Sequence, residues 1–115
     1  MDIEAWLSEL KRAWSSHDID ALLSLFAEDV EYWETPHKQL MSFEDIRSEW
    51  QGVTSQKDIQ ITTTVYASID DKHTIIWDLQ YVDPGNVKRV WSGTYLITLN
   101  NNGLCIYFHH TGEKL

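Results

Sequence analysis

The sequence of 115 residues has one cysteine, few cations and no long hydrophobic run. Cys105 cannot form an internal disulfide, and no CxxC or HxxxH spacing is present to hold a metal. Nine Lys and Arg residues stand against 18 Asp and Glu residues, giving a net charge of −9 without the cationic surface that nucleic acids and anionic membranes require. No apolar run approaches the ~18 residues of a membrane span. We therefore expect no cofactor, no nucleic-acid partner and no membrane partner.

The N-terminal segment MDIEAWLSELKRAW is amphipathic and begins acidic, unlike a signal peptide or a transit peptide. We therefore expect a cytoplasmic protein. Hydrophobic residues make up 43% of the chain and include six Trp and five Tyr, which is ample for one core. We expect a single domain over residues 1–115.

Three segments repeat their apolar residues every three or four positions, the spacing of one helix face. The first covers about residues 2–16. The second starts at Asp18, whose carboxylate can cap the first turn, and the third starts at Ser42, which forms a capping box with Asp45. Their apolar stripes are Ile3, Trp6, Leu7, Leu10 and Trp14; Ile19, Leu22, Leu23 and Phe26; and Phe43, Ile46, Trp50 and Val53.

After the second helix an acidic turn leads into a segment of period 2, in which Val30, Tyr32 and Glu34 point to one side. Pro36 ends this strand. Helices followed by sequential hairpins predict an α+β domain in which a curved, mainly antiparallel sheet wraps around three N-terminal helices. The hairpin strands are the four stretches rich in β-branched and aromatic residues, 58–69, 73–82, 87–99 and 104–111.

Alternation along these strands assigns their faces, although one extra residue in a strand would exchange them. The more apolar face is placed against the helices and carries Val30, Tyr32, Glu34, Ile75, Trp77, Leu79, Tyr81, Trp91, Gly93, Tyr95, Ile97, Leu99, Ile106, Phe108 and His110. The helices cannot cover the broad opposite face, so we expect a homodimer through it. That outer face carries Asp78, Gln80, Ser92, Thr94, Thr98, Cys105, Tyr107 and His109.

The order of four motifs resembles a known family. The motifs are DIDALLSLFAEDVEYWETP, SFEDIRSEW, WSGTYLITL and NNGLCIYFHH, and they span nearly the whole chain. Together they resemble the SnoaL-like branch of the nuclear transport factor 2-like superfamily, which includes ketosteroid isomerase and polyketide cyclases. The resemblance implies a cone in which three helices pack in the concavity of the sheet. It says little about activity, because function belongs to the site and not to the fold.

Glu34 is the first candidate catalytic residue. Counting from the LFA-x-D pattern, the resemblance places it where ketosteroid isomerase keeps its catalytic base, whereas counting back from Pro36 places Thr35 there. A carboxylate desolvated in the cone would have a raised pKa suited to general acid–base catalysis. The alternative is a rim position, solvated or paired with Lys or Arg. The family's oxyanion-hole positions correspond to Leu10 and Tyr95, and since Leu10 has no donor we do not expect steroid isomerase activity.

His110 is the second candidate, because it points inward two residues beyond Phe108 and can reach Glu34 or Tyr95 across the cavity. The alternative is a buried histidine satisfied by one polar neighbour. His109 then faces outward, so the two histidines cannot chelate one metal from a regular strand.

Aromatic side chains of inward phase are numerous for a small domain, and they predict an aromatic pocket for a small apolar or aromatic molecule. Three hypotheses follow. The first is a ligand-binding protein without an established reaction, the second a cofactor-free isomerase, cyclase or hydrolase-like enzyme with Glu34 as base and Tyr95 or His110 as donor, and the third an interaction module with a filled cone. The candidate ligand-binding residues are Trp14, Tyr32, Trp50, Trp77, Trp91 and Phe108.

Overall fold

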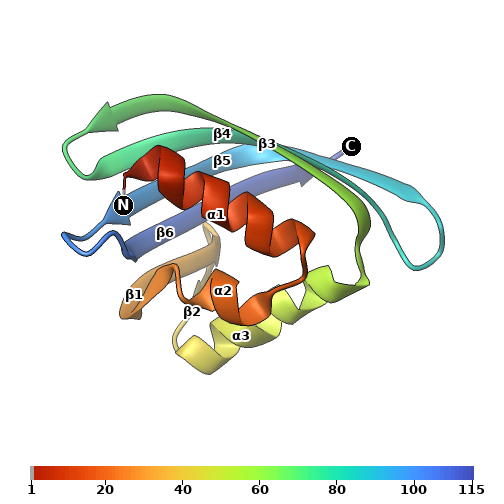
Figure 1. Ribbon diagram of the computed structural model, residues 1–115, viewed down its shortest axis with the longest axis horizontal. Coiled ribbons are helices and arrows are strands. Elements are labelled where there is room, and N and C mark those ends of the chain that lie inside the picture. Colours follow the sequence, from red (N-terminus) through yellow and green to blue (C-terminus); the bar gives the residue numbers. More distant parts are fainter. Residues whose placement is uncertain (1) are drawn as a thin grey trace.

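The computed structural model describes residues 2–115, which form helices and one mixed sheet (Figure 1). The helices are α1 (Ile3–Ser15), α2 (Ile19–Leu23), α3 (Phe43–Gln51) and a short 3₁₀ helix, η1 (Gly52–Ser55). The strands are β1 (Phe26–Thr35), β2 (Lys38–Leu40), β3 (Lys57–Ile69), β4 (Lys72–Val82), β5 (Lys88–Leu99) and β6 (Cys105–Lys114).

The six strands form one sheet in the order β2-β1-β6-β5-β4-β3. All neighbours are antiparallel except β1 and β6, which are parallel. The sheet curves around the helices, with α1 lying across β4 to β6 and α2 and α3 lying beside β1 and β2 (Figure 1). The predicted α+β fold, with helices in the concavity of a curved sheet, is therefore confirmed.

Two helix starts follow the predicted capping chemistry. The Asp18 carboxylate accepts a hydrogen bond from the Ala21 backbone N–H at 3.1 Å, and Ser42 Oγ accepts one from the Asp45 backbone N–H at 3.1 Å. Each cap satisfies a backbone donor that the first helical turn leaves free. None of the helices in residues 2–115 is long and apolar enough to cross a membrane.

The predicted boundary between α2 and β1 is wrong. Phe26 is the first residue of β1 and pairs with Cys105 of β6, so it does not extend the α2 stripe. The expected acidic turn lies inside this strand, where the register shifts between Phe26 and Glu31. The Leu25 carbonyl accepts a hydrogen bond from the Cys105 N–H at 2.9 Å. Pairing with a strand 79 residues later therefore overrides the local helical spacing, a long-range effect that periodicity cannot register.

The predicted faces of Cys105 and Ile106 are also wrong. Leu99 pairs with Cys105 whereas Thr98 pairs with Tyr107, so β6 contains one extra residue at its start. This bulge turns Cys105 into the core, where it is fully buried, and leaves Ile106 36% exposed. Burial raises the pKa of the Cys105 thiol, whose Sγ donates to the Tyr107 carbonyl at 3.0 Å. From Tyr107 onward the strand follows the predicted alternation.

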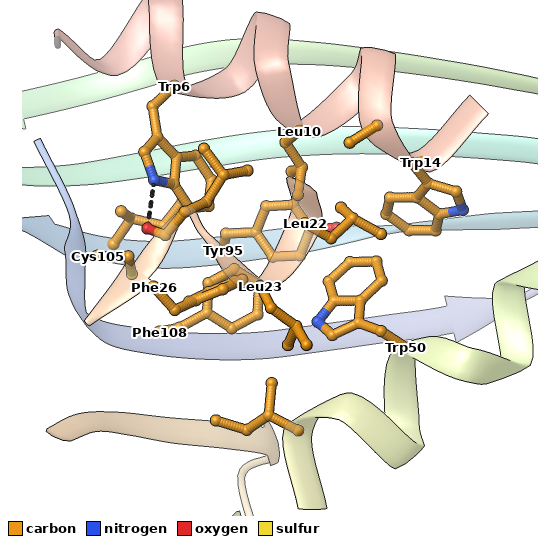
Figure 2. Close-up of a cluster of buried hydrophobic side chains, with 14 of the residues drawn as sticks. Trp6, Leu10, Trp14, Leu22, Leu23, Phe26, Trp50, Tyr95, Cys105 and Phe108 are labelled. Atoms are coloured by element: carbon orange, nitrogen blue, oxygen red, sulfur yellow. Dashed lines mark hydrogen bonds between the residues drawn. The ribbon is translucent and has the colours of Figure 1, made fainter. Parts of the chain in front are cut away.

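One end of the cone is packed with buried side chains. Trp6 is fully buried and meets Phe26 edge-to-face, with ring centroids 5.7 Å apart. Its Nε1 donates to the Leu25 carbonyl at 3.0 Å, the dashed contact in Figure 2. Phe108 and Cys105 complete this group. The indole thus buries a large apolar area while its polar atom is satisfied, which is what a stable core requires.

Candidate functional site

A cavity of about 270 Å³ occupies the other end of the cone. Its walls come from α1, β1, α3, η1, β4, β5 and β6, so helices and sheet both contribute to it. The structure brings all nine predicted site residues to this cavity. The lining residues are Trp14, Tyr32, Glu34, Glu49, Trp50, Gly52, Val53, Gln56, Trp77, Leu79, Tyr81, Trp91, Tyr95, Phe108 and His110.

Two tryptophans form the helical wall of the cavity. Trp14 of α1 and Trp50 of α3 meet edge-to-face, with centroids 4.9 Å apart and ring planes at 87° (Figure 2). Trp14 Nε1 donates to Gln56 Oε1 at 2.9 Å. The Gln56 backbone carbonyl in turn accepts from His17 Nε2 at 2.7 Å. Gln56 therefore fixes the Trp14 ring, a role that the sequence analysis did not assign to it.

Trp77 forms the floor on the sheet side. Its ring stacks on Tyr95 at a centroid distance of 5.4 Å and on His110 at 5.3 Å. Gly93 and Gly112 lie beneath it, and a Cβ added to either would lie within 2.9 Å of Trp77 Cζ2. The indole occupies the space that these two glycines leave open. The inward phase of Gly93 was predicted, but its value as space for a neighbouring ring was not.

Glu34 lies at the end of β1 in the cavity wall, with its side chain 22% exposed. Burial, with a smaller contribution from the nearby Glu49 carboxylate, raises its pKa to about 7. Tyr32 and Lys38 oppose this rise. Thr35 is exposed and accepts a hydrogen bond from the His37 N–H at 3.1 Å, so Glu34 and not Thr35 faces the cavity.

Glu49 is a charged site residue that was not among those predicted from the sequence patterns. It lies on α3 with 38% of its side chain exposed, and its Oε2 is 3.9 Å from Lys38 Nζ. A signal was available, because Glu49 follows Ile46 by three residues and precedes Val53 by four. It therefore borders the apolar stripe of α3 and could have been placed beside the cavity by helical spacing alone.

His110 reaches Glu34 through the backbone carbonyl and not through the carboxylate. Its Nδ1 lies 2.7 Å from the Glu34 backbone carbonyl and 3.9 Å from Glu34 Oε1. A carbonyl can only accept, so Nδ1 carries the proton. Burial lowers the pKa of His110, which favours the neutral ring. The histidine thus ties β6 to β1, in agreement with the alternative of a buried histidine satisfied by one polar neighbour.

The other hydrogen-bond donors near the cavity are uncharged. Burial, and then the charge of Glu34, raises the pKa of Tyr95, so its hydroxyl remains a neutral donor. Within residues 2–115, Trp50 Nε1 and Trp77 Nε1 are buried without a hydrogen-bond partner. Leu10 is fully buried and offers no donor. The site therefore combines neutral donors with one carboxyl group that can gain or lose a proton near neutral pH.

The part of the chain described by the structure contains no group of three or more His, Cys, Asp or Glu side chains arranged to hold a metal ion. The chemistry available from its own side chains is acid–base transfer at Glu34, hydrogen bonding by Tyr95 and apolar contact with the aromatic walls.

A family model described as a SnoaL-like domain matches residues 4–108. No curated protein sequence shows a significant match. Among solved structures, a Δ5-3-ketosteroid isomerase from Mycobacterium sp. is 13% identical with a TM-score of 0.79, and the alignment covers 98% of each chain. At this identity the similarity shows the fold alone.

Two similar structures contain small molecules. A Mycobacterium tuberculosis protein in complex with estradiol-17beta-hemisuccinate is 17% identical with a TM-score of 0.76, covering 93% of this chain and 90% of its own. A ketosteroid isomerase-like protein from Catenulispora acidiphila in complex with trimethylamine is 16% identical with a TM-score of 0.75, covering 92% and 83%.

Proposed function

We propose, since this chain belongs to the SnoaL-like domain family, that its cavity binds a small apolar or aromatic molecule. The aromatic lining carries this proposal: Trp14 and Trp50 form the helical wall, and Trp77 and Trp91 contribute from the sheet. A volume of about 270 Å³ is just below the ~300–1,000 Å³ range of ligand pockets, which favours ligands of one or two rings. The complexes of the two distant relatives support use of this fold for small organic ligands.

Tryptophan fluorescence tests the proposal. A set of one-ring and two-ring aromatic fragments is titrated into the protein, and bound fragments should quench the indoles of the cavity walls. Trp91→Ala should weaken binding because Trp91 lines the cavity. Trp33→Ala is the matched control, since Trp33 is also half-buried but does not line the cavity. Absence of any saturable response, or equal losses in both variants, would contradict the proposal.

Acid–base catalysis is the second candidate function. It is favoured by the Glu34 pKa of about 7, at which the carboxyl group can accept or donate a proton near neutral pH. Tyr95, rather than His110, is the donor that accompanies it, because His110 Nδ1 already donates to a backbone carbonyl.

Deuterium exchange tests this candidate without knowledge of the substrate. Carbonyl-containing fragments that bind are incubated with the protein in D₂O, and NMR follows exchange of the hydrogens next to the carbonyl. Glu34→Gln should abolish exchange and retain binding, whereas Tyr95→Phe should reduce it. If every bound fragment exchanged its hydrogens no faster than in buffer alone, the result would contradict acid–base catalysis and support ligand binding only.

We also propose a homodimer through the outer sheet face. Ile76 and Leu96 are each 42% exposed there, and a hollow on this face is lined by Leu96, Thr98 and Tyr107. Burying these apolar side chains would favour association. Sedimentation equilibrium should give twice the chain mass of 13.5 kDa. Leu96→Glu should shift the protein towards monomer, and a wild-type monomer at ~50 μM would contradict the proposal, since dimers of standard interface size are stable well below this concentration.

A further inference from the structure

We propose that the ligand of this cavity is an organic cation, an amine or quaternary ammonium group carried on a small apolar body. The inference rests on the proposed function, because it names the ligand class of the same cavity. Two features of the lining carry it: the sign of the charges around the cavity and the aromatic side chains on both of its walls.

The charges that line the cavity are carboxylates. Glu34 approaches from β1 and Glu49 from α3. Lys38 of β2 lies outside the lining, 59% exposed and 3.9 Å from Glu49 Oε2, where water screens its charge. His110 of β6 donates from Nδ1 to a backbone carbonyl and its lowered pKa keeps it neutral. The lining therefore holds two acidic groups and no cation of its own.

The Tyr32 and Tyr95 hydroxyls are the remaining titratable groups near Glu34, and both are neutral because burial raises the pKa of each. Neutral hydroxyls do not cancel a negative charge. The pKa of Glu34 is raised because burial removes water from its carboxylate and no positive charge in the lining replaces that water. A bound cation would provide that positive charge inside the cavity.

Aromatic rings line the cavity from opposite sides. Trp14 and Trp50 belong to the helices, and their planes stand at 87°. Tyr81 and Trp91 belong to β4 and β5. The face of an indole or phenol ring attracts an ammonium group, and more strongly where water is excluded. A neutral apolar ligand could use the same rings, but it would leave the Glu34–Glu49 repulsion in place, and an anion would increase it.

A matched ligand pair tests the proposal. Benzyltrimethylammonium keeps its charge at every pH, and neopentylbenzene has the same shape with carbon in place of nitrogen. Calorimetry and tryptophan quenching should show the cation binding at least about tenfold more tightly above roughly pH 8, where Glu34 is ionised. The preference should shrink towards about pH 5.5. Because a cation favours the charged carboxylate, its binding near pH 7 should release protons, seen as a dependence of the heat on buffer ionisation.

Variants separate the two carboxylates from the general acidity of the protein. Glu34→Gln and Glu49→Gln should each reduce affinity for the cation several-fold at pH ~8 and leave affinity for neopentylbenzene unchanged or higher. The controls are Glu28→Gln on β1 and Glu44→Gln on α3, which are exposed and outside the cavity lining and should have no effect. Thermal melts confirm that each variant is folded.

The outcomes distinguish this inference from the function on which it rests. Equal or tighter binding of neopentylbenzene at pH ~8 would overturn the cation proposal and leave the apolar pocket standing, as would preferential binding of benzoate. Binding of the cation with the same affinity in all four variants would place it on the acidic surface and would also overturn the proposal. Failure of every probe to bind would contradict the proposed function itself.

Discussion

The two ends of the cone use the same kinds of residue in different ways. At the closed end, which is the end packed around Trp6, the Trp6 indole is fully buried and its Nε1 donates to the Leu25 carbonyl. The open end is the one that contains the cavity. At the open end, Trp50 and Trp77 are almost as deeply buried, but their Nε1 atoms lack partners within residues 2–115. Glu34 adds a carboxyl group there whose pKa is raised to about 7.

The closed end stabilises the fold, whereas the open end contains groups that destabilise it. Satisfied polar atoms and dense aromatic packing stabilise the closed end. Unpaired donors and a desolvated carboxyl group destabilise the open end, and such features concentrate at functional sites. Substitutions at the closed end should therefore mainly lower the free energy of unfolding. Substitutions at the open end should mainly change ligand affinity.

The largest effect on stability is expected at the closed end. Trp6→Ala removes a fully buried indole and one of the two donors to the Leu25 carbonyl, which keeps the Cys105 N–H, so the free energy of unfolding should fall by ~3–5 kcal/mol. Urea denaturation measures this. The half-buried Trp33→Ala serves as control and should cost much less. Equal losses of unfolding free energy in the two variants would contradict the view that the closed end contributes most to stability.

The next effect is a pH-dependent gain at the open end. The Glu34 pKa rises from 4.5 to about 7 on folding, which corresponds to roughly 3 kcal/mol at most. Its stabilising contribution is present below about pH 4.5 and is lost as pH rises to about 7, because the folded protein disfavours the charged form. Glu34→Gln should therefore be more stable than the wild type at pH ~8 and similar at pH ~4.

Denaturation curves at both pH values measure this difference, with Glu28→Gln as an exposed control on the same strand. A Glu34→Gln protein that is less stable than the wild type at pH ~8 would mean that Glu34 is a stabilising ion-pair partner and not a destabilising cavity group.

Gly93 is a position where the open end is packed as tightly as the closed end. A Cβ there would clash with the Thr111 carbonyl and lie 2.8 Å from Trp77 Cζ2. Gly93→Ala should cost ~1–3 kcal/mol and displace the Trp77 ring, which urea denaturation and near-UV circular dichroism would detect. Thr94→Ala, one residue further along β5, is the control. A silent Gly93→Ala would show that β5 and β6 can separate freely.

The smallest effect concerns Gln56. Gln56→Leu leaves Trp14 Nε1 without its partner and should cost about 1 kcal/mol. It should also weaken fragment binding, because the Trp14 ring is no longer fixed in the cavity wall. Gln60→Leu, at an exposed position of β3, is the control. Fragment affinities and melting temperatures indistinguishable between the two variants would contradict this role for Gln56.

Local patterns predicted most of the architecture, because helical spacing, caps and strand alternation act over a few residues. The caps at Asp18 and Ser42 are examples. Patterns failed where distant segments decide the outcome. Phe26 is drawn into β1 by pairing with β6, and the extra residue after Cys105 appears only when β5 and β6 are aligned.

The sequence predicted which residues line the candidate site better than it predicted their hydrogen bonds. Alternation placed Glu34, Tyr95 and His110 on the cavity side, where the structure has them. It could not show that His110 bonds to a backbone carbonyl, because that depends on the separation of two strands. Glu49 was missed because its charge suggested solvent. The catalytic and ligand-binding roles, the homodimer and the cytoplasmic location stay predictions.

The open end differs from a solvated rim in keeping the Glu34 carboxyl group in a desolvated cavity. Carbon-13 NMR of protein labelled at glutamate carboxyl groups tests it most directly, with the Glu34 signal assigned by its loss in Glu34→Gln. This signal should titrate near pH 7, well above the ordinary value of 4.5. A Glu34 pKa at or below 4.5 would contradict it.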